Sequence, residues 1–99
     1  MLSGLDAHIV DVRMPDLTGM VVAWVTLCSS EAAAAHAANY PSRASEHGPS
    51  FREMLRTGTG VTAQQLADAQ KKRTSITGQF ADVLESVDAM ACPAGGHPA

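Results

Sequence analysis

The stretch MVVAWVTLCSSEAAAA, residues 20–35, holds the densest apolar pattern in the sequence and decides how the rest is interpreted. Its apolar side chains at Met20, Trp24, Leu27 and Cys28 recur at three- and four-residue spacing, which predicts a helix that buries this one face. The alanine run in its second half favours helix but offers little side-chain area, so the helix is expected to lie close against another element. We expect it to begin at a cap on Asp16 or Thr18 and to end near Ala38.

The segments that flank this helix predict strands. Residues 7–13 contain β-branched side chains and are followed by Pro15, which cannot donate to a sheet ladder. Residues 88–92 form a short apolar run that is bounded by Pro93. The sequence therefore predicts one strand at each end of a helical middle.

The middle of the chain predicts a loop and two further helices. Residues 42–50 are polar and indicate a loop, and residues 51–55 predict a short helical turn closed by Gly58 and Gly60. Thr62 followed by Gln65 is typical of a capping box, so a long helix should start there. Its expected buried residues are Leu66, Ala69, Ile76, Phe80, Val83, Leu84 and Val87.

Together these elements predict an α/β fold in the order strand, long helix, short helix, long helix, strand. Because two strands do not make a stable sheet alone, we expect residues 1–99 to be an incomplete piece of a mixed sheet flanked by helices. Its apolar faces would then pack on structure outside this chain, either a preceding part of the same domain or a partner chain.

Composition and charge exclude several classes of function. The 99 residues carry a net charge of −3, with no basic stripe and only 4% aromatic residues, which argues against nucleic-acid binding. The longest apolar stretch, near residues 20–27, is shorter than the ~20 residues that span a bilayer. Cys28 and Cys92 are too few for a disulfide framework and indicate free thiols. We therefore expect a cytoplasmic protein that does not enter a membrane.

One short motif suggests signalling. Residues 11–19, DVRMPDLTG, resemble the phosphoacceptor segment of response-regulator receiver domains, in which Asp11 would take the phosphoryl group. The likeness covers nine residues, and the acidic pair, the Thr/Ser and the Lys that such domains need have no counterparts here. A degenerate receiver therefore remains an alternative.

Other chemically suggestive residues lack the required spacing. Ser29 and Ser30 lie in mid-helix without a base, and Cys28 and His36 are eight residues apart, about 12 Å along a helix. His8 and Asp11 would point to opposite faces of a strand, and the four histidines show no zinc-ligand spacing. Lys71, Lys72 and Arg73 are expected on a solvated helix face. The sequence therefore predicts no catalytic residue, metal site or cofactor.

The order of features along the chain resembles the C-terminal part of amidase signature family enzymes. The resemblance covers roughly residues 4–98. The segments that carry it are Ile9–Val12 with its following proline, Ala23-Trp24, Ser30-Glu31-Ala32 leading to His36, Asn39–Arg43, His47-Gly48-Pro49 through Arg52, Leu55 and Gly58, Ala69 with Arg73, Phe80, and Val87–Pro93.

This resemblance implies amide hydrolysis by a lysine, a cis-serine and a nucleophilic serine, with backbone amides as the oxyanion hole. All three residues belong to a glycine- and serine-rich core that has no match here, so no catalytic residue is carried over. The chain would supply scaffold and pocket wall, with Val87–Pro93 nearest the pocket, and would be inactive alone. A non-catalytic interaction module is the second alternative.

Overall fold

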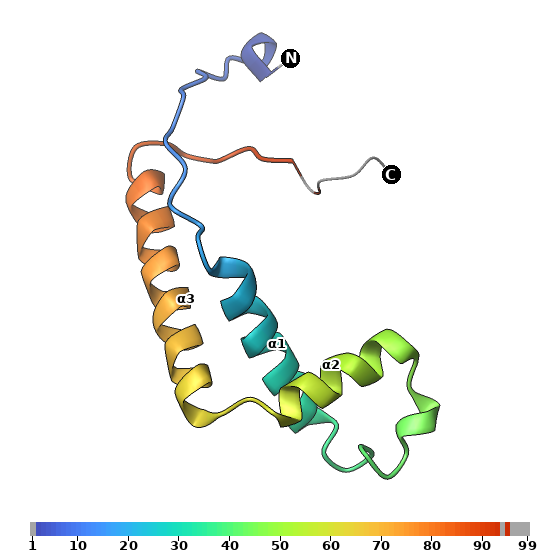
Figure 1. Cartoon of the computed structure of the whole chain (residues 1–99). Coiled ribbons are helices and arrows are strands. Elements are labelled where there is room, and N and C mark those ends of the chain that lie inside the picture. Colours follow the sequence, from blue (N-terminus) through green and yellow to red (C-terminus); the bar gives the residue numbers. More distant parts are fainter. Residues whose placement is uncertain (1, 94, 96–99) are drawn as a thin grey trace.

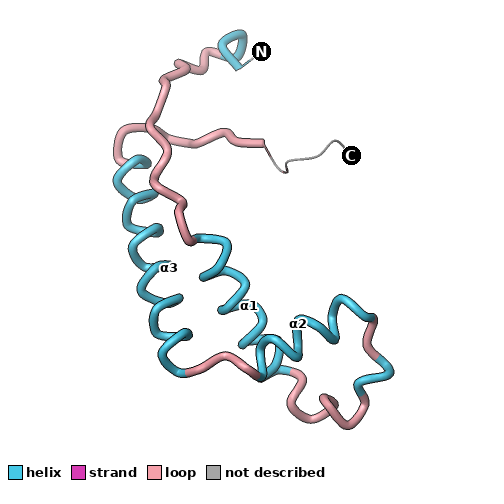
Figure 2. The backbone as a smooth tube through the Cα atoms, viewed as in Figure 1, coloured by secondary structure: helices cyan, strands magenta, loops and turns pink. Residues whose placement is uncertain are grey.

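The computed structural model describes residues 2–93 and residue 95, and within these it contains three α-helices (Figure 1). These are α1 (Met20–Ala35), α2 (Pro49–Thr59) and α3 (Ala63–Leu84). Two short 3-10 helices, η1 (Leu2–Leu5) and η2 (Ala44–Glu46), lie near the start of the chain and in the connection between α1 and α2. The remaining described segments are loops and turns (Figure 2).

The predicted α/β class is wrong, because the described part of the chain is helical and contains no strand. Residues 7–13 and 88–92, which were expected to be strands, are irregular (Figure 2). A strand exists only when a neighbour pairs with its backbone N–H and C=O groups, and neither segment takes part in a backbone ladder. Their β-branched and apolar composition is thus compatible with a strand but does not create one.

Helix α1 begins and ends inside its predicted bounds. Gly19 stands at its start with a φ of 77°, a left-handed conformation that glycine adopts without strain. The predicted side-chain cap is wrong, since Asp16 instead accepts a 2.9 Å hydrogen bond from the backbone N–H of Thr18 and closes a local turn. The helix ends at Ala35 rather than Ala38, and the N–H of Ala37 bonds to the carbonyl of Ala34, three residues back, instead of continuing the four-residue α-helical pattern.

Helix α2 is longer than the predicted turn at residues 51–55. Pro49 occupies its first position, where the missing proline N–H is not needed. It continues through Gly58 and ends at Gly60, so the first of these glycines lies inside the helix rather than closing it. The predicted capping box is confirmed at the start of α3, where Gln65 N–H donates to the Thr62 hydroxyl at 3.1 Å and Thr62 N–H donates to the Gln65 side chain at 2.8 Å.

Helix α1 is the centre of the fold and packs against both other helices. α1 and α3 run side by side in opposite directions, while α2 crosses the end of α1 (Figure 1). The small core consists of Ala23, Leu27, Leu55, Ala69 and Ile76, with Leu66 packed against it. Of the residues expected to be buried on α3, Phe80 and Val83 are half-buried, and Leu84 is 47% exposed.

The molecule is open and elongated. Its radius of gyration is 18.4 Å, whereas a compact chain of about 100 residues has ~13 Å. Its accessible surface is 7791 Å², whereas a folded monomer of this mass exposes roughly 5,400 Å². The whole chain, with its irregular end segments included, therefore buries much less surface than a compact domain of the same length.

Candidate functional site

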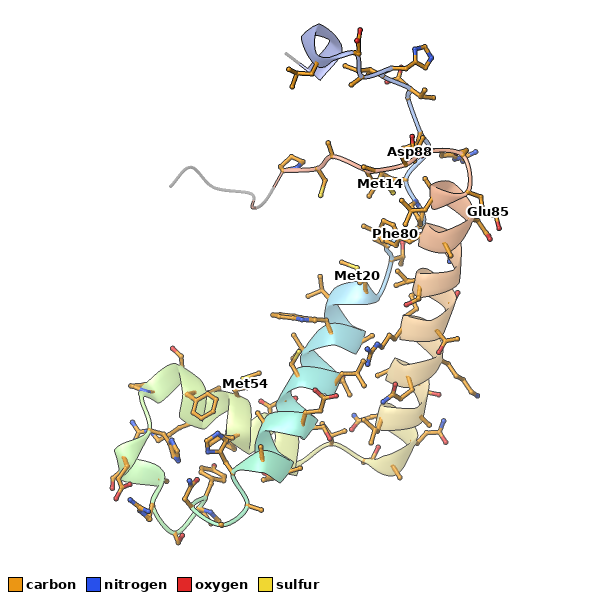
Figure 3. All side chains as sticks on the ribbon, turned by 180° about the vertical axis from the view of Figure 1, so that it is seen from behind. Met14, Met20, Met54, Phe80, Glu85 and Asp88 are labelled. Atoms are coloured by element: carbon orange, nitrogen blue, oxygen red, sulfur yellow. The ribbon has the colours of Figure 1, made fainter. Side chains whose placement is uncertain are left out.

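The most distinctive surface is the uncovered side of α1. The helix carries one charged residue, Glu31, and is apolar on nearly every side, a pattern typical of helices buried on all sides. Yet Val22 is 71% exposed and Trp24 is 61% exposed. We call the exposed residues Met20, Val21, Val22, Trp24 and Val25 the apolar face of α1. Figure 3 shows Met20 at the end of the helical pair where α1 begins, the same end that carries Met14 and Phe80.

An open groove of about 410 Å³ runs between α1 and α3. It is mainly apolar, with one acidic and one basic side chain. The residues that line it are Met20, Ala23, Trp24, Leu27, Cys28, Glu31, Arg73 and Ile76. A second groove of about 420 Å³ is lined by Gly19, Val22, Ala23, Thr26, Gln65, Asp68, Ala69 and Lys72. Val87–Pro93, the segment expected nearest a pocket, lines neither groove.

The connection between α1 and α2 brings two histidines together. Nδ1 of His36 and Nε2 of His47 lie 3.2 and 3.3 Å from the same atom, Oδ1 of Asn39. The two rings meet edge to face with their centres 5.4 Å apart, and the Phe51 ring contacts both, at 5.1 and 5.5 Å. All four side chains are half-buried. This group, which we call the histidine cluster, was not found by sequence reasoning.

A weak signal for the histidine cluster was nevertheless present in the sequence. His36 follows directly on the alanine run that ends α1, and His47 stands directly before the Gly48-Pro49 pair that starts α2. Residues at the two ends of one connection can meet only if that connection closes on itself. The spacing of eleven residues does not reveal such closure.

The adjacent serines lie where the sequence placed them, within a helix. Ser29 is 1% exposed, and its hydroxyl donates to the backbone carbonyl of Val25 at 2.6 Å, with a longer contact to Thr26 at 3.3 Å. Ser30 is half-buried on the same helix. The Ser29 hydroxyl is therefore occupied by its own helix and faces α2 rather than solvent.

Asp11 does not stand at the end of a strand, as a receiver phosphoacceptor would. It is exposed in an irregular segment, and the receiver alternative receives no support.

Lys71 and Arg73 are exposed, as expected for a solvated helix face, whereas Lys72 is half-buried. Cys28 is half-buried and Cys92 is exposed, and both are free thiols.

Three ionisable groups outside the histidine cluster are shifted by local hydrogen bonds. The Thr18 hydroxyl and then its backbone N–H hold the pKa of Asp16 below its ordinary value. A hydrogen bond from Arg56 lowers the pKa of Glu53, and the same contact raises that of Arg56. All three groups are solvent-exposed, so these shifts reflect surface pairing rather than a buried reactive site.

Residues 2–93 hold no group of three or more His, Cys, Asp or Glu side chains that could bind a metal ion. None of the helices described here has the length and hydropathy needed to cross a bilayer.

Comparison with known proteins gives one relationship. The chain is 35% identical over 66 residues to proteins named "Putative amidase AmiD" from Mycobacterium tuberculosis and Mycobacterium bovis. The match takes in 67% of this chain but 14% of the length of those proteins. No known family profile matches the chain, and no solved structure matches it. The relationship to amidases is therefore a partial one, limited to this segment.

Proposed function

We propose that this chain is the C-terminal part of an amidase-type hydrolase and serves as its scaffold. The observation that carries the proposal is the 35% identity over 66 residues to the protein named "Putative amidase AmiD", of whose length this segment covers 14%. The reaction is hydrolysis of a carbon–nitrogen amide bond, with a serine nucleophile and its lysine base supplied by residues outside this chain. Residues 1–99 hold that catalytic part in place.

The side-chain chemistry of the chain supports a scaffold role. An activated serine must lie within hydrogen-bond reach of a base, about 3 Å. Apart from the Thr18 hydroxyl, which lowers the pKa of the exposed Asp16 carboxylate, the serine and threonine hydroxyls that donate hydrogen bonds in the described residues donate to backbone carbonyls of their own helix or its last turn. We therefore place no catalytic residue on this chain.

The apolar face of α1 is the proposed contact with the catalytic part. The accessible surface exceeds that of a compact monomer by roughly 2,400 Å², which is larger than the ~800 Å² that each partner of an ordinary interface buries. At about 25 cal/mol per Å² of apolar area, covering the side chains of Val22 and Trp24 gives a strong driving force for docking. Because these side chains are exposed when the chain is alone, we expect the isolated chain to be only marginally stable.

The proposal is tested by complementation. The full chain is co-expressed with the Mycobacterium tuberculosis AmiD protein from which the matched segment has been deleted. Co-elution of the two and ammonia release from a panel of aliphatic and aromatic amides are then measured. We expect the pair to co-elute and release ammonia, and each part alone to release none.

A matched pair of variants locates the contact. Val22→Glu adds one negative charge to the apolar face of α1 and should abolish co-elution. Gln70→Glu adds the same charge at an exposed position of α3 and should leave it intact. Amide hydrolysis by the lone chain, or co-elution without any ammonia release, would contradict the proposed function.

A further inference from the structure

The histidine cluster presents two imidazole nitrogens to one point. Nδ1 of His36 and Nε2 of His47 approach the Asn39 oxygen from the two ends of the connection between α1 and α2, at 3.2 and 3.3 Å. Because the Asn39 oxygen accepts, each of these nitrogens donates an N–H to it, and a cation bound between the rings would take the place of these two protons. Two converging imidazole nitrogens beside an amide oxygen are a donor set that suits zinc, nickel and copper ions.

We propose that His36 and His47 form a two-histidine binding site for a divalent transition-metal cation, with Zn²⁺ as the reference ion and Asn39 beside it. The spacing of the rings fits this assignment. Two imidazoles on one tetrahedral zinc ion, at Zn–N distances of ~2.0 Å, have ring centres about 5 Å apart. The observed separation is 5.4 Å, so the rings need only a small displacement to share an ion.

The surroundings determine what such an ion would meet. Phe51 covers both rings and limits the access of water on its side. Neither ring is hydrogen-bonded or ion-paired to a carboxylate of residues 2–93. Glu46, the acidic residue next to His47, is exposed and paired with Arg43 at 2.6 Å. Binding therefore depends on two neutral imidazoles, with water completing the coordination, and is weaker than at a four-ligand structural zinc site.

A cation at this position would link the end of α1 to the start of α2. It would close the connection of residues 36–48, which is now held by the hydrogen bonds to Asn39 and the contacts of Phe51. Because an ion that binds only the folded form stabilises it by mass action, added metal should raise the melting temperature. This inference is independent of the proposed amidase role.

The test is a titration of the full chain with Zn²⁺, followed by calorimetry and by the melting temperature. We expect one equivalent of Zn²⁺ to bind and the melting temperature to rise with the Zn²⁺ concentration. His36→Gln and His47→Gln should each remove the binding. His8→Gln, at an exposed position in an irregular segment, should leave it unchanged.

Two further variants separate this site from trivial sources of binding. Cys28→Ser combined with Cys92→Ser should retain the binding, which excludes the thiols as ligands. Asn39→Asp places a carboxylate oxygen where both nitrogens converge and should tighten Zn²⁺ binding, a gain that a merely structural role would not produce. No binding by the native chain, binding that survives both histidine substitutions, or binding lost with the cysteines would overturn the proposal.

Discussion

Gly58 of α2 lies directly against the backbone carbonyl of Ser29 of α1. A Cβ atom at position 58 would overlap that carbonyl oxygen and would come within 2.8 Å of the Ala33 Cβ. The two helices can thus cross this closely only because residue 58 has no side chain. The small side chains in the alanine-rich second half of α1 also allow α1 and α2 to approach each other closely.

Gly58→Ala should therefore destabilise the fold although alanine favours helix. Forcing one methyl group into a tight contact costs typically about 1–3 kcal/mol, and the atom in the way here is backbone. Urea unfolding followed by circular dichroism measures the effect. Gly78→Ala on α3 is the matched control, because no atom lies within 4 Å of its Cβ position and the change should stabilise by about 0.5–1 kcal/mol. Equal stability of the two variants would contradict the contact with Ser29.

Leu55→Ala should cause the largest loss of stability among simple truncations. Leu55 is 0% exposed and is the largest fully buried side chain. Removing a buried leucine side chain costs about 2–5 kcal/mol, which is a large share of the stability that so open a chain can have. The helical circular dichroism signal at low temperature is the measurement. Leu84→Ala, at a position that is 47% exposed, should change it little, and a similar loss in both variants would show that Leu55 is not in the core.

Thr62→Ala should shorten or fray the start of α3. The Thr62 hydroxyl accepts the N–H of Gln65, and loss of such a cap costs about 1 kcal/mol. Thr62→Ser keeps the hydroxyl and should behave like the native chain. Amide hydrogen exchange in the first turn of α3 tests this, because the N–H of Gln65 should exchange faster in Thr62→Ala alone. Unchanged protection there would contradict the capping box.

The turn before α1 should weaken in acid. The pKa of Asp16 is lower in the folded chain than its ordinary value of 3.8, chiefly through the Thr18 hydroxyl and also through its N–H. A lowered pKa means that the contribution of Asp16 is present above 3.8 and is lost as the pH falls through the folded value.

Thr18→Val tests the cause of this shift. The substitution removes the hydroxyl and keeps the N–H, so the Asp16 pKa should move part of the way back towards 3.8, as followed by carbon-13 NMR of the carboxylate. Thr26→Val, within α1, is the control. A pKa of Asp16 that does not change with Thr18→Val would contradict the hydrogen-bond assignment.

Features that depend on neighbours within one helical turn were predictable from the sequence. The Thr62–Gln65 capping box and the long helix behind it follow from contacts three and four residues apart. The presence of a helix at residues 20–35 followed in the same way, although its start was misplaced. Instead of a side-chain cap, the structure places Gly19 with a positive φ and a turn closed by Asp16 before the helix.

The candidate site could be predicted only in part. The sequence indicated that α1 would lie close against another element, and α1 does pack against both α2 and α3. It did not pair His36 with His47, since their meeting requires the intervening connection to fold back, which no local pattern encodes. It also placed Trp24 on the buried face, although α3 covers its neighbour Ala23 instead.

What the sequence by itself determined is local: that helices form near residues 20–35 and after Thr62, and that Thr62 and Gln65 cap the second of these helices. What only the tertiary structure decided depends on distant partners. Residues 7–13 and 88–92 have strand-like composition but remain irregular because no neighbouring strand pairs with them. Gly58 is indispensable only because Ser29, twenty-nine residues earlier, lies against it. The conformational preference of a residue depends on neighbours within about one helical turn. Strand pairing, helix crossing and burial depend instead on the elements that pack against the residue.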